Sequence, residues 1–347
     1  MSRLRLGVVM GGNSAEYEIS LFSGCGILSN LNYEKYDVST IIIDKSGDWH
    51  LYFGDIEKIK SDKWQENISD FRRVEFTNSG KLIMCDSAQD FKTFDVVFPI
   101  LHGFGGEDGK IQGMFELSAT PYVGCGATCS SVCMDKYLTN TILEKHGINI
   151  PKWITFWCNE RKVIAQMQAA VEKSMEYPVF VKPASNGSSI GVVKVKHESE
   201  LLCALEFAFA KDEKVLVQQA IEGSEVECAI LEGRELIVSV PGEIEPCNEF
   251  YDYEAKYLKP SVLHIPARIS EAAKKEVQLA AKCVYELLSC RSMARVDFIV
   301  DKRGKPWFLE VNTIPGFTEI SMYPKLMMEA GLRYSELIDR LIELAVT

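Results

Sequence analysis

The segment Ala294-Arg-Val-Asp-Phe-Ile-Val-Asp-Lys-Arg-Gly-Lys-Pro-Trp-Phe-Leu-Glu-Val-Asn312 alternates polar and apolar residues on both sides of a turn signal, Arg303-Gly304. This pattern predicts a β-hairpin. With the turn centred at 303–304, Asp297 faces Glu310 and Arg295 faces Asn312 across the two strands. Successive side chains of a strand point to opposite faces, so these four polar side chains share one face. The other face is apolar and carries Val296, Phe298, Leu309 and Val311.

Two carboxylates that face each other across a strand pair repel, and a divalent cation removes the repulsion. Asp297, Glu310 and Asn312 offer the hard oxygen ligands that Mg²⁺ prefers, so we interpret the polar face as a metal site rather than a solvated face with an Arg–carboxylate pair. The segment that follows, Thr313 to Thr318, contains a Pro-Gly turn. The backbone N–H of Gly316 beside Arg295 predicts an oxyanion site.

A second polar feature lies upstream, at the end of an apolar run over 177–183. Lys182 is costly to bury there without an anion. It is followed by a loop over 185–191 that is rich in serine and glycine, and β character resumes over 192–196. Backbone N–H and hydroxyl groups of such a loop can bind phosphate oxygens. We therefore expect an antiparallel flap that covers a phosphate group.

The N-terminal part begins with a β-like run over 6–10, a glycine pair and a helical pattern over 15–31, and a second β-like run follows over 38–43. This order predicts a parallel α/β unit. Gly11-Gly12 lacks the G-x-G-x-x-G fingerprint, which argues against a nicotinamide-dependent oxidoreductase. Helices are also expected over 130–146 and, with Ser270 as the N-cap, to about Leu288.

The composition excludes several classes of protein. A chain of 347 residues suits two or three subdomains, and its net charge of −11 without a basic patch argues against nucleic-acid binding. Apolar runs are too short for a signal peptide or a membrane span, so we expect a cytoplasmic protein without membrane association. The 11 cysteines suggest reduced thiols. Cys125, Cys129 and Cys133 repeat every four residues, a spacing that we interpret as core packing in preference to a metal site.

Motifs along the whole chain, taken together, resemble those of the D-alanine–D-alanine ligases, which have the ATP-grasp fold. They are Gly11-Gly-Asn-Ser-Ala-Glu-Tyr-Glu-Ile-Ser20, His102-Gly-Phe-Gly-Gly-Glu-Asp-Gly109, Met134-Asp-Lys136, Phe180-Val-Lys-Pro183 with Gly187-Ser-Ser-Ile-Gly191, Glu249-Phe-Tyr-Asp-Tyr-Glu-Ala-Lys-Tyr257, Ala294-Arg-Val-Asp297, Glu310-Val-Asn-Thr-Ile-Pro-Gly-Phe-Thr318 and Ser321-Met-Tyr-Pro324. The resemblance implies an α/β and α+β protein. An N-terminal parallel α/β subdomain over 1–123 would precede the two lobes of the ATP-grasp fold, over 124–218 and 219–347.

The resemblance also implies roles for matching residues. The phosphates of ATP would be bound by Lys136, Lys182 and, at the γ-phosphate, Lys256. The remainder of the nucleotide would contact Gln218, Gln219, Ile221 and Glu225, where Gln218 replaces a glutamate that is common in the family. Two Mg²⁺ (or Mn²⁺) ions would be held by Asp297, Glu310 and Asn312, in agreement with the hairpin argument.

The two substrates would meet the remaining positions. Glu16 would bind the ammonium group of the first D-alanine, with His102 nearby. Ser188, linked to Tyr257, would help to close the site and would also belong to the nucleotide site. Arg295 and Gly316 would stabilise the oxyanion. The second amino acid would be bound by Ser321, through its carboxylate, and by Met322.

The activity that this resemblance implies is ATP-dependent joining of two D-alanine molecules through D-alanyl phosphate, for peptidoglycan precursor synthesis. A homodimer is expected on the same ground. One alternative is a D-alanine–D-serine or D-alanine–D-lactate ligase of the glycopeptide-resistance type. D-serine ligases usually carry Arg where Met322 stands, and D-lactate ligases usually lack the aromatic loop from Tyr251 to Tyr257. A non-catalytic ATP-binding module is another alternative, but it should have lost a lysine or a metal carboxylate, and none is lost.

Overall fold

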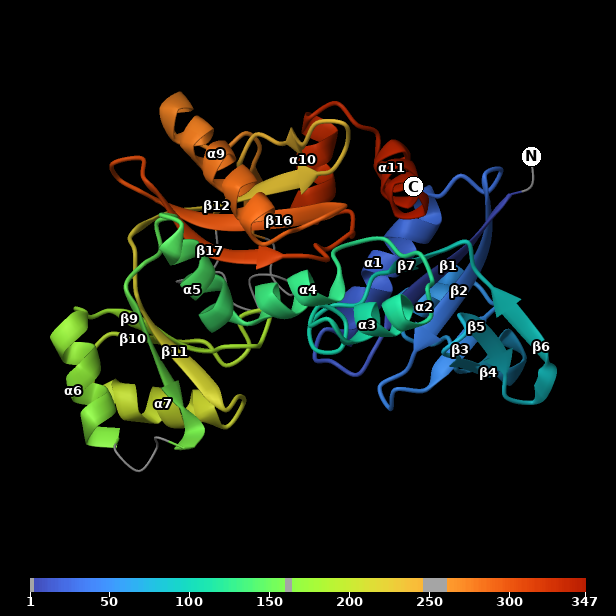
Figure 1. Cartoon of the computed structure of the whole chain (residues 1–347), viewed down its shortest axis with the longest axis horizontal. Coiled ribbons are helices and arrows are strands. Elements are labelled where there is room, and N and C mark those ends of the chain that lie inside the picture. The colour runs from blue at the N-terminus through green and yellow to red at the C-terminus, as the bar shows by residue number, and fades with distance from the viewer. Residues whose placement is uncertain (1–2, 160–163, 246–260) are drawn as a thin grey trace.

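A computed structural model describes residues 3–159, 164–245 and 261–347 of the chain (Figure 1). Three β-sheets follow one another along the sequence, and each is covered by helices. The N-terminal sheet lies to the right in Figure 1, the central sheet at the lower left, and the C-terminal sheet above and between them. The segments that connect the three sheets therefore meet in the middle of the molecule.

The centre of the N-terminal sheet is the parallel unit that the sequence predicted. β1 (Leu4–Gly11) pairs in parallel with β2 (Tyr36–Ile43) and β7 (Val96–Pro99), and α1 (Tyr17–Asn30) packs against β1. β1 is buried from Leu6 onward, as the apolar run requires. Antiparallel strands that the sequence analysis did not predict extend this sheet to the order β6-β5-β4-β3-β2-β1-β7. They are β3 (Trp49–Tyr52), β4 (Phe71–Phe76), β5 (Lys81–Met84) and β6 (Ser87–Thr93), accompanied by α2 (Ile56–Lys60), η1 (Ile68–Asp70) and α3 (Lys110–Leu117).

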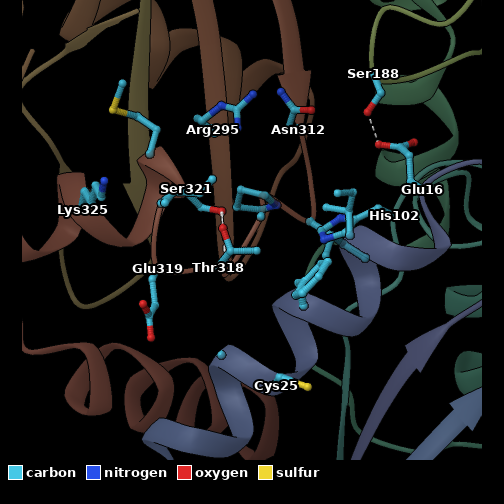
Figure 2. Close-up of a pocket in the computed structure, with 18 of the residues that line it drawn as sticks. Glu16, Cys25, His102, Ser188, Arg295, Asn312, Thr318, Glu319, Ser321 and Lys325 are labelled. Carbon is cyan, nitrogen blue, oxygen red and sulfur yellow. Dashed lines mark hydrogen bonds between the residues drawn. The ribbon is translucent and has the colours of Figure 1, made fainter. Parts of the chain in front are cut away.

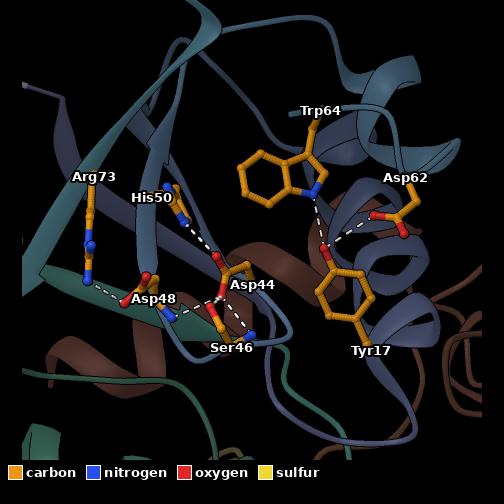
Figure 3. Close-up of polar contacts among 8 residues, drawn as sticks. All are labelled: Tyr17, Asp44, Ser46, Asp48, His50, Asp62, Trp64 and Arg73. Atoms are coloured by element: carbon orange, nitrogen blue, oxygen red, sulfur yellow. Dashed lines mark hydrogen bonds and ion pairs between the residues drawn. The ribbon is translucent and has the colours of Figure 1, made fainter. Parts of the chain in front are cut away.

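Polar contacts anchor the start of α1 and the adjacent edge of this sheet (Figure 3). Asp44, at the end of β2, accepts a hydrogen bond from the backbone N–H of Ser46 at 2.9 Å, and His50 Nε2 lies 2.9 Å from its other carboxylate oxygen. Trp64 Nε1 donates to the hydroxyl of Tyr17 at 3.0 Å. Because Tyr17 is the first residue of α1, this bond ties the start of the helix to the segment that carries Trp64.

The central sheet is antiparallel, in the order β10-β9-β11-β8. β9 (Val179–Pro183) pairs with β10 (Val193–Val195), and the loop between them is the serine- and glycine-rich segment. This pair is the flap expected from the sequence. The sheet is completed by β8 (Trp153–Trp157) and β11 (Lys214–Gln219), and its helices are α6 (Ile164–Ser174), η3 (Glu198–Glu200) and α7 (Leu201–Phe209).

The C-terminal sheet contains β12 (Gly223–Leu231), β16 (Met293–Asp301) and β17 (Pro306–Asn312) as neighbours, and α9 (Glu271–Leu287) packs across them. The expected N-cap of α9 is confirmed, since Ser270 Oγ accepts a hydrogen bond from the Ala273 N–H at 3.2 Å. The sheet also includes β13 (Ile237–Val238), β14 (Gly242–Glu245) and β15 (Val262–His264).

The predicted pairings Arg295–Asn312 and Asp297–Glu310 are present. The predicted turn position was wrong, because the pairs nearest the turn are centred on Arg303 and not between Arg303 and Gly304. Phe298 pairs with Phe308 instead of Leu309, because the register shifts immediately after Asp297. A β-bulge at this point accommodates the hairpin loop, in which the Asp301 carboxylate accepts a hydrogen bond from the Lys305 N–H. Phe308, with a relative exposure of 1%, therefore enters the core in place of Leu309.

The single helix expected over 130–146 is divided in two. α4 (Ala127–Met134) and α5 (Lys136–Lys145) meet at Asp135, whose extended ψ of 100° interrupts the helical backbone. The Asp135 carboxylate accepts hydrogen bonds from the N–H groups of Tyr137 and Leu138, so this aspartate acts as the N-cap of α5. Lys136 is consequently the first residue of a helix.

The C-terminal helices α10 (Met322–Glu329) and α11 (Tyr334–Val346) bring the end of the chain back to its beginning. α11 packs on α1 and β7, as Figure 1 shows, and Lys35 forms an ion pair with Asp339 at 2.6 Å. One apolar core therefore joins the N-terminal sheet to α10 and α11. Among the described residues, no helix has the length and apolar character needed to cross a bilayer.

Candidate active site

A cavity of about 850 Å³ lies where the three parts of the chain meet (Figure 2). Its walls come from the start of α1, the loop after β9, the polar face of β16 and β17, and the segment that leads into α10. Eight of the residues that the sequence analysis selected line it: Glu16, His102, Ser188, Arg295, Asn312, Gly316, Ser321 and Met322. Residues from 16 to 322 are thus brought into one concave site.

One side of the cavity carries a carboxylate–hydroxyl pair. Ser188 Oγ donates a hydrogen bond to Glu16 Oε1, and both residues are buried (Figure 2). Ser188 has a φ of 48°, a left-handed conformation that a serine adopts only when its surroundings hold it there. A Cβ on Gly103 would collide with the Glu16 carboxylate, so the glycine of the His102-Gly motif makes room for this side chain.

The carboxylate–hydroxyl pair joins the N-terminal and central parts of the chain. Its hydroxyl closes the serine- and glycine-rich loop over the start of α1. The expected partner of Ser188 was Tyr257, which lies outside the described residues.

The polar face of the C-terminal sheet forms another wall of the cavity. Arg295 donates to both oxygens of Asp297, from Nε at 2.9 Å and from a terminal nitrogen at 2.8 Å. Asn312 Nδ2 donates to the same carboxylate at 3.0 Å. The Arg295 side chain is 14% exposed and that of Asp297 is 2% exposed, so this network is almost entirely removed from water.

Glu227, which the sequence analysis missed, belongs to the same network. It lies on β12 directly opposite Asp297, and its Oε2 is 3.0 Å from Arg295 Nε. Burial disfavours the charged form of Arg295, but the charges of Asp297 and Glu227 outweigh this effect and raise the pKa of the guanidinium. An acidic residue within an otherwise apolar strand was the sequence signal that could have revealed Glu227.

The oxygen donors of this face fit a divalent cation. Asp297 is paired with Glu310 on one side and with Glu227 on the other, so three carboxylates lie side by side on adjacent strands. A single guanidinium, that of Arg295, lies among them, and it leaves an excess of negative charge. Carboxylate and amide oxygens are the ligands that Mg²⁺ takes.

The segment before α10 presents a backbone turn and a hydroxyl to the cavity. Ser321 Oγ accepts a hydrogen bond from the Thr318 N–H at 3.0 Å and lies 2.7 Å from Thr318 Oγ1. A Cβ at position 316 would approach Ser321 Oγ to 2.7 Å, so the hydroxyl can occupy this position only beside a glycine. Met322, the next residue, begins α10 and is 4% exposed.

His102 is linked to this segment through the hydroxyl of Ser23. Its Nε2 lies 2.9 Å from the hydroxyl of Ser23 on α1, and that hydroxyl accepts a hydrogen bond from the Phe317 N–H at 3.3 Å. Burial lowers the pKa of His102 to about 4, so the imidazole is neutral at pH 7. His102 therefore contributes as a neutral hydrogen-bonding group that helps to hold the turn at Gly316.

Glu107 is a second residue that the sequence analysis did not select. Its Oε2 accepts a hydrogen bond from the Gly103 N–H at 2.8 Å, and its side chain lines the cavity. Burial, together with the nearby charge of Glu16, raises the pKa of Glu107 to about 8. Its position within the His102–Gly109 motif was the available signal.

Two of the residues expected to bind the nucleotide, Lys182 and Gln218, lie on the central sheet and outside the lining of the cavity. Lys182 Nζ donates to Gln218 Oε1 at 2.8 Å, across the paired strands β9 and β11. Lys136 Nζ donates to the carbonyl oxygen of Asn186 at 2.7 Å, so it lies beneath the serine- and glycine-rich loop. Lys256 lies outside the described residues.

The other expected nucleotide contacts follow along the same part of the chain. The side chain of Gln219 is bound to the backbone of Glu176, with Nε2 donating to the carbonyl at 2.7 Å. Ile221 lies in the connection from β11 to β12, and Glu225 lies on β12, opposite Ile299. The structure thus brings Lys182 and Gln218 together and places the amine of Lys136 at the serine- and glycine-rich loop, whereas the side chain of Gln219 is bound to the Glu176 backbone.

Comparisons with known proteins agree on one family. The family model described as "D-ala D-ala ligase N-terminus" matches residues 5–125, and "D-ala D-ala ligase C-terminus" matches residues 142–343. The chain is 46% identical to D-alanine–D-alanine ligase from Caldicellulosiruptor bescii, covering 100% of this chain and 96% of the relative. It is 43% identical to D-alanine–D-alanine ligase B from Clostridium tetani, covering 100% and 94%.

Solved structures give the same result for the fold. The crystal structure of VanG D-Ala:D-Ser ligase from Enterococcus faecalis superposes with a TM-score of 0.90 at 40% identity, covering 99% of this chain and 100% of that one. The D-alanine–D-alanine ligase from Coxiella burnetii has a TM-score of 0.87 at 35% identity, covering 100% and 94%.

Proposed function

Since the chain belongs to the D-alanine–D-alanine ligase family, we propose that it joins two D-alanine molecules at the expense of ATP, through a D-alanyl phosphate, to supply a peptidoglycan precursor. One observation carries this proposal. The same cavity holds a carboxylate suited to an ammonium group, a guanidinium with a backbone turn suited to an oxyanion, and a hydroxyl suited to a carboxylate.

The first D-alanine binds with its ammonium group at Glu16, close to His102. A carboxylate is a poor acyl donor, so one of its oxygens attacks the γ-phosphorus of ATP and ADP leaves. Lys136 and Lys182 bind the phosphates, together with Lys256. Their positive charges stabilise the negative charge of the phosphoryl group while it is transferred. The hydrogen bond from Ser188 to Glu16 places the flap over the substrates, which protects the acyl phosphate from water.

Asp297, Glu310 and Asn312 hold two Mg²⁺ or Mn²⁺ ions, which supply charge neutralisation at the phosphates when bound. The three carboxylates of this wall support the assignment, since their charge exceeds that of Arg295. Gln218 and Glu225 bind the remainder of the nucleotide, with the backbone of Gln219 and Ile221.

The amine nitrogen of the second D-alanine then attacks the acyl carbon, the C–O bond to phosphate breaks, and the amine loses a proton. Negative charge develops on the carbonyl oxygen, where Arg295 and the Gly316 N–H stabilise it. Ser321 binds the carboxylate of this second substrate and Met322 contacts its side chain. Glu227 acts as a positioning residue, because it contacts Arg295 Nε, the atom that also donates to Asp297.

A decisive experiment measures phosphate release from ATP and Mg²⁺ with D-alanine or L-alanine as the amino acid. We expect phosphate release with D-alanine but not with L-alanine, together with an equal amount of D-alanyl-D-alanine. A Glu16→Gln variant, which keeps the size of the side chain but loses its charge, should have a higher KM for the first D-alanine. Equal rates with the two isomers would refute the substrate assignment.

A second candidate acceptor is D-serine, which the likeness to the Enterococcus faecalis D-Ala:D-Ser ligase suggests. Lys325 lines the cavity one helical turn after Met322, so a polar group is within the reach of this subsite. The apolar Met322 favours D-alanine, however. Product analysis with equal D-alanine, D-serine and D-lactate should yield mainly the D-alanine dipeptide, and a majority of mixed product would assign the chain to the resistance type.

Organisation and setting complete the proposal. We keep the subdomains 1–123, 124–218 and 219–347 as a proposal; the three sheets support a division into three parts, and β11 of the central sheet runs to Gln219, one residue beyond the second boundary. A cytoplasmic location is supported by ten cysteines of the described residues that are all free thiols. A homodimer is proposed from the resemblance, and the molar mass in solution tests it.

A further inference from the structure

Four buried cysteines gather in the core of the C-terminal sheet, outside the lining of the candidate active site. Cys125 precedes α4, Cys129 and Cys133 lie on α4, and Cys290 follows α9. All four have a relative exposure of 9% or less. We call them the cysteine cluster. Its fourth member is 161 residues from Cys129, so the sequence showed only three of the four thiols.

The sulfur atoms of Cys125, Cys129 and Cys290 gather as closely as the ligands of one metal ion, and Cys133 Sγ lies beside Cys129 but outside that group of three. Cys129 Sγ is 3.7 Å from Cys133 Sγ and 3.6 Å from Cys290 Sγ. The sulfurs of Cys125, Cys129 and Cys290 all lie within 4.8 Å of one another. Zinc binds thiolates at about 2.3 Å, which places the sulfurs of a tetrahedron about 3.8 Å apart. No other group of histidine, cysteine or acidic side chains among the described residues is gathered this closely.

The sequence spacing agrees with this geometry. Cys125, Cys129 and Cys133 are separated by three residues each, within the range found for zinc ligands. On α4, residues four apart share one helix face, so Cys129 and Cys133 point together toward Cys290. The surroundings are apolar, with Leu143 and Val226 in the same core cluster. A site that is enclosed in this way is suited to a structural ion rather than to a reactive one.

The cysteine cluster adjoins the backbone that follows Cys290. Cys125 Sγ lies 3.4 Å from the Arg291 carbonyl oxygen and 3.6 Å from that of Met293. Metal binding would replace these S–H contacts, because a thiolate is the form of cysteine that binds a metal.

We propose that the cysteine cluster binds one zinc ion, as a closed structural site with Cys125, Cys129, Cys133 and Cys290 as its ligands. Four S–H bonds give way to four Zn–S bonds, and four protons pass to the solvent. The ion links α4 to the segment between α9 and β16. α4 packs on α3 and on β17, as Figure 1 shows, and its end leads to Lys136. The site therefore holds together the region on which the metal and phosphate residues of the active site depend.

The experiment uses the full chain without an affinity tag that binds metals, expressed with zinc and purified without chelators. Zinc per chain is measured by mass spectrometry of the elements, and the protein is also loaded with Co²⁺. We expect one zinc per chain and the strong visible absorption of a tetrahedral cobalt–thiolate centre. Cys129→Ser and Cys290→Ser should lose both signals. Cys228→Ser is the matched control, because Cys228 is also buried but lies on β12, outside the group of gathered sulfurs.

The wild-type chain alone decides the question if the variants do not fold. Zinc absent from the wild type, together with a cobalt spectrum that lacks thiolate bands, would overturn the proposal and leave four packed thiols. A disulfide between two of the four cysteines in freshly isolated protein would overturn it as well. Zinc content and D-alanine turnover are read separately on each preparation, so either the zinc site or the proposed function can fail without the other.

Discussion

Replacing Arg295 with methionine tests whether the polar wall of the cavity is held together by a single buried cation. The substitution keeps most of the volume of the side chain but leaves Asp297 and Glu227 facing each other without the guanidinium that lies 2.8 Å and 3.0 Å from them. Removing one partner of a buried ion pair costs about 3–5 kcal/mol. This range is appropriate because the side chains of both carboxylates are no more than 3% exposed.

The loss of free energy converts into a shift of the unfolding midpoint. With an unfolding entropy of about 2.1 cal/mol/K per residue, a chain of 347 residues has about 0.7 kcal/mol/K if it unfolds as one unit. The Arg295→Met variant should therefore unfold about 4–7 °C below the wild type, without added metal. Mg²⁺ should raise the unfolding midpoint of the variant by more than it raises that of the wild type, because the cation replaces the lost positive charge.

The assay is a calorimetric or fluorescence melt with and without Mg²⁺, combined with kcat for D-alanyl-D-alanine formation. Arg295→Lys is the matched control: it keeps the positive charge but loses the two-pronged contact with Asp297, so its midpoint should fall by less. Turnover of Arg295→Met should decrease by about 10²–10³ if the guanidinium also stabilises the oxyanion. An unchanged midpoint in Arg295→Met, or a shift that Mg²⁺ leaves as it is, would refute the account of this wall.

Three further substitutions test separate parts of the site. The pKa of His102 falls from 6.5 to about 4 on folding, so its contribution to stability is present above about pH 6.5 and is lost as the pH falls toward 4. In urea melts, His102→Gln should therefore reduce the loss of stability between pH 6.5 and pH 4 by up to about 3 kcal/mol. An unchanged pH dependence would contradict this prediction. In Gly316→Ala, a Cβ 2.7 Å from Ser321 Oγ should displace the hydroxyl and lower kcat/KM for D-alanine by about tenfold or more at a nearly constant midpoint; wild-type kcat/KM would argue against the role of this turn. Lys182→Met should raise the KM for ATP while the KM for D-alanine changes little, and the opposite pattern would place Lys182 in the amino-acid site.

Much of the site could be predicted from the sequence because its information is local. Alternation along 294–312 places Arg295, Asp297, Glu310 and Asn312 on one face of a hairpin, whatever the sheet around it does. The predicted turn position was wrong because a β-bulge shifts the register. The shift lies between Asp297 and the turn, so the predicted Asp297–Glu310 pairing still holds. The division of 130–146 at Asp135 was missed, since an aspartate inside a helical pattern becomes a cap only when the chain bends there.

Contacts between distant segments required the tertiary structure. Glu16 and Ser188 are 172 residues apart, Glu227 reaches Arg295 through the pairing of β12 with β16, and Cys290 joins the cysteine cluster from the segment after α9. Periodicity records which face of an element is buried, but not which element covers it. That choice is made by all the apolar faces together, as they find the one arrangement in which each is buried and every buried charge has a partner.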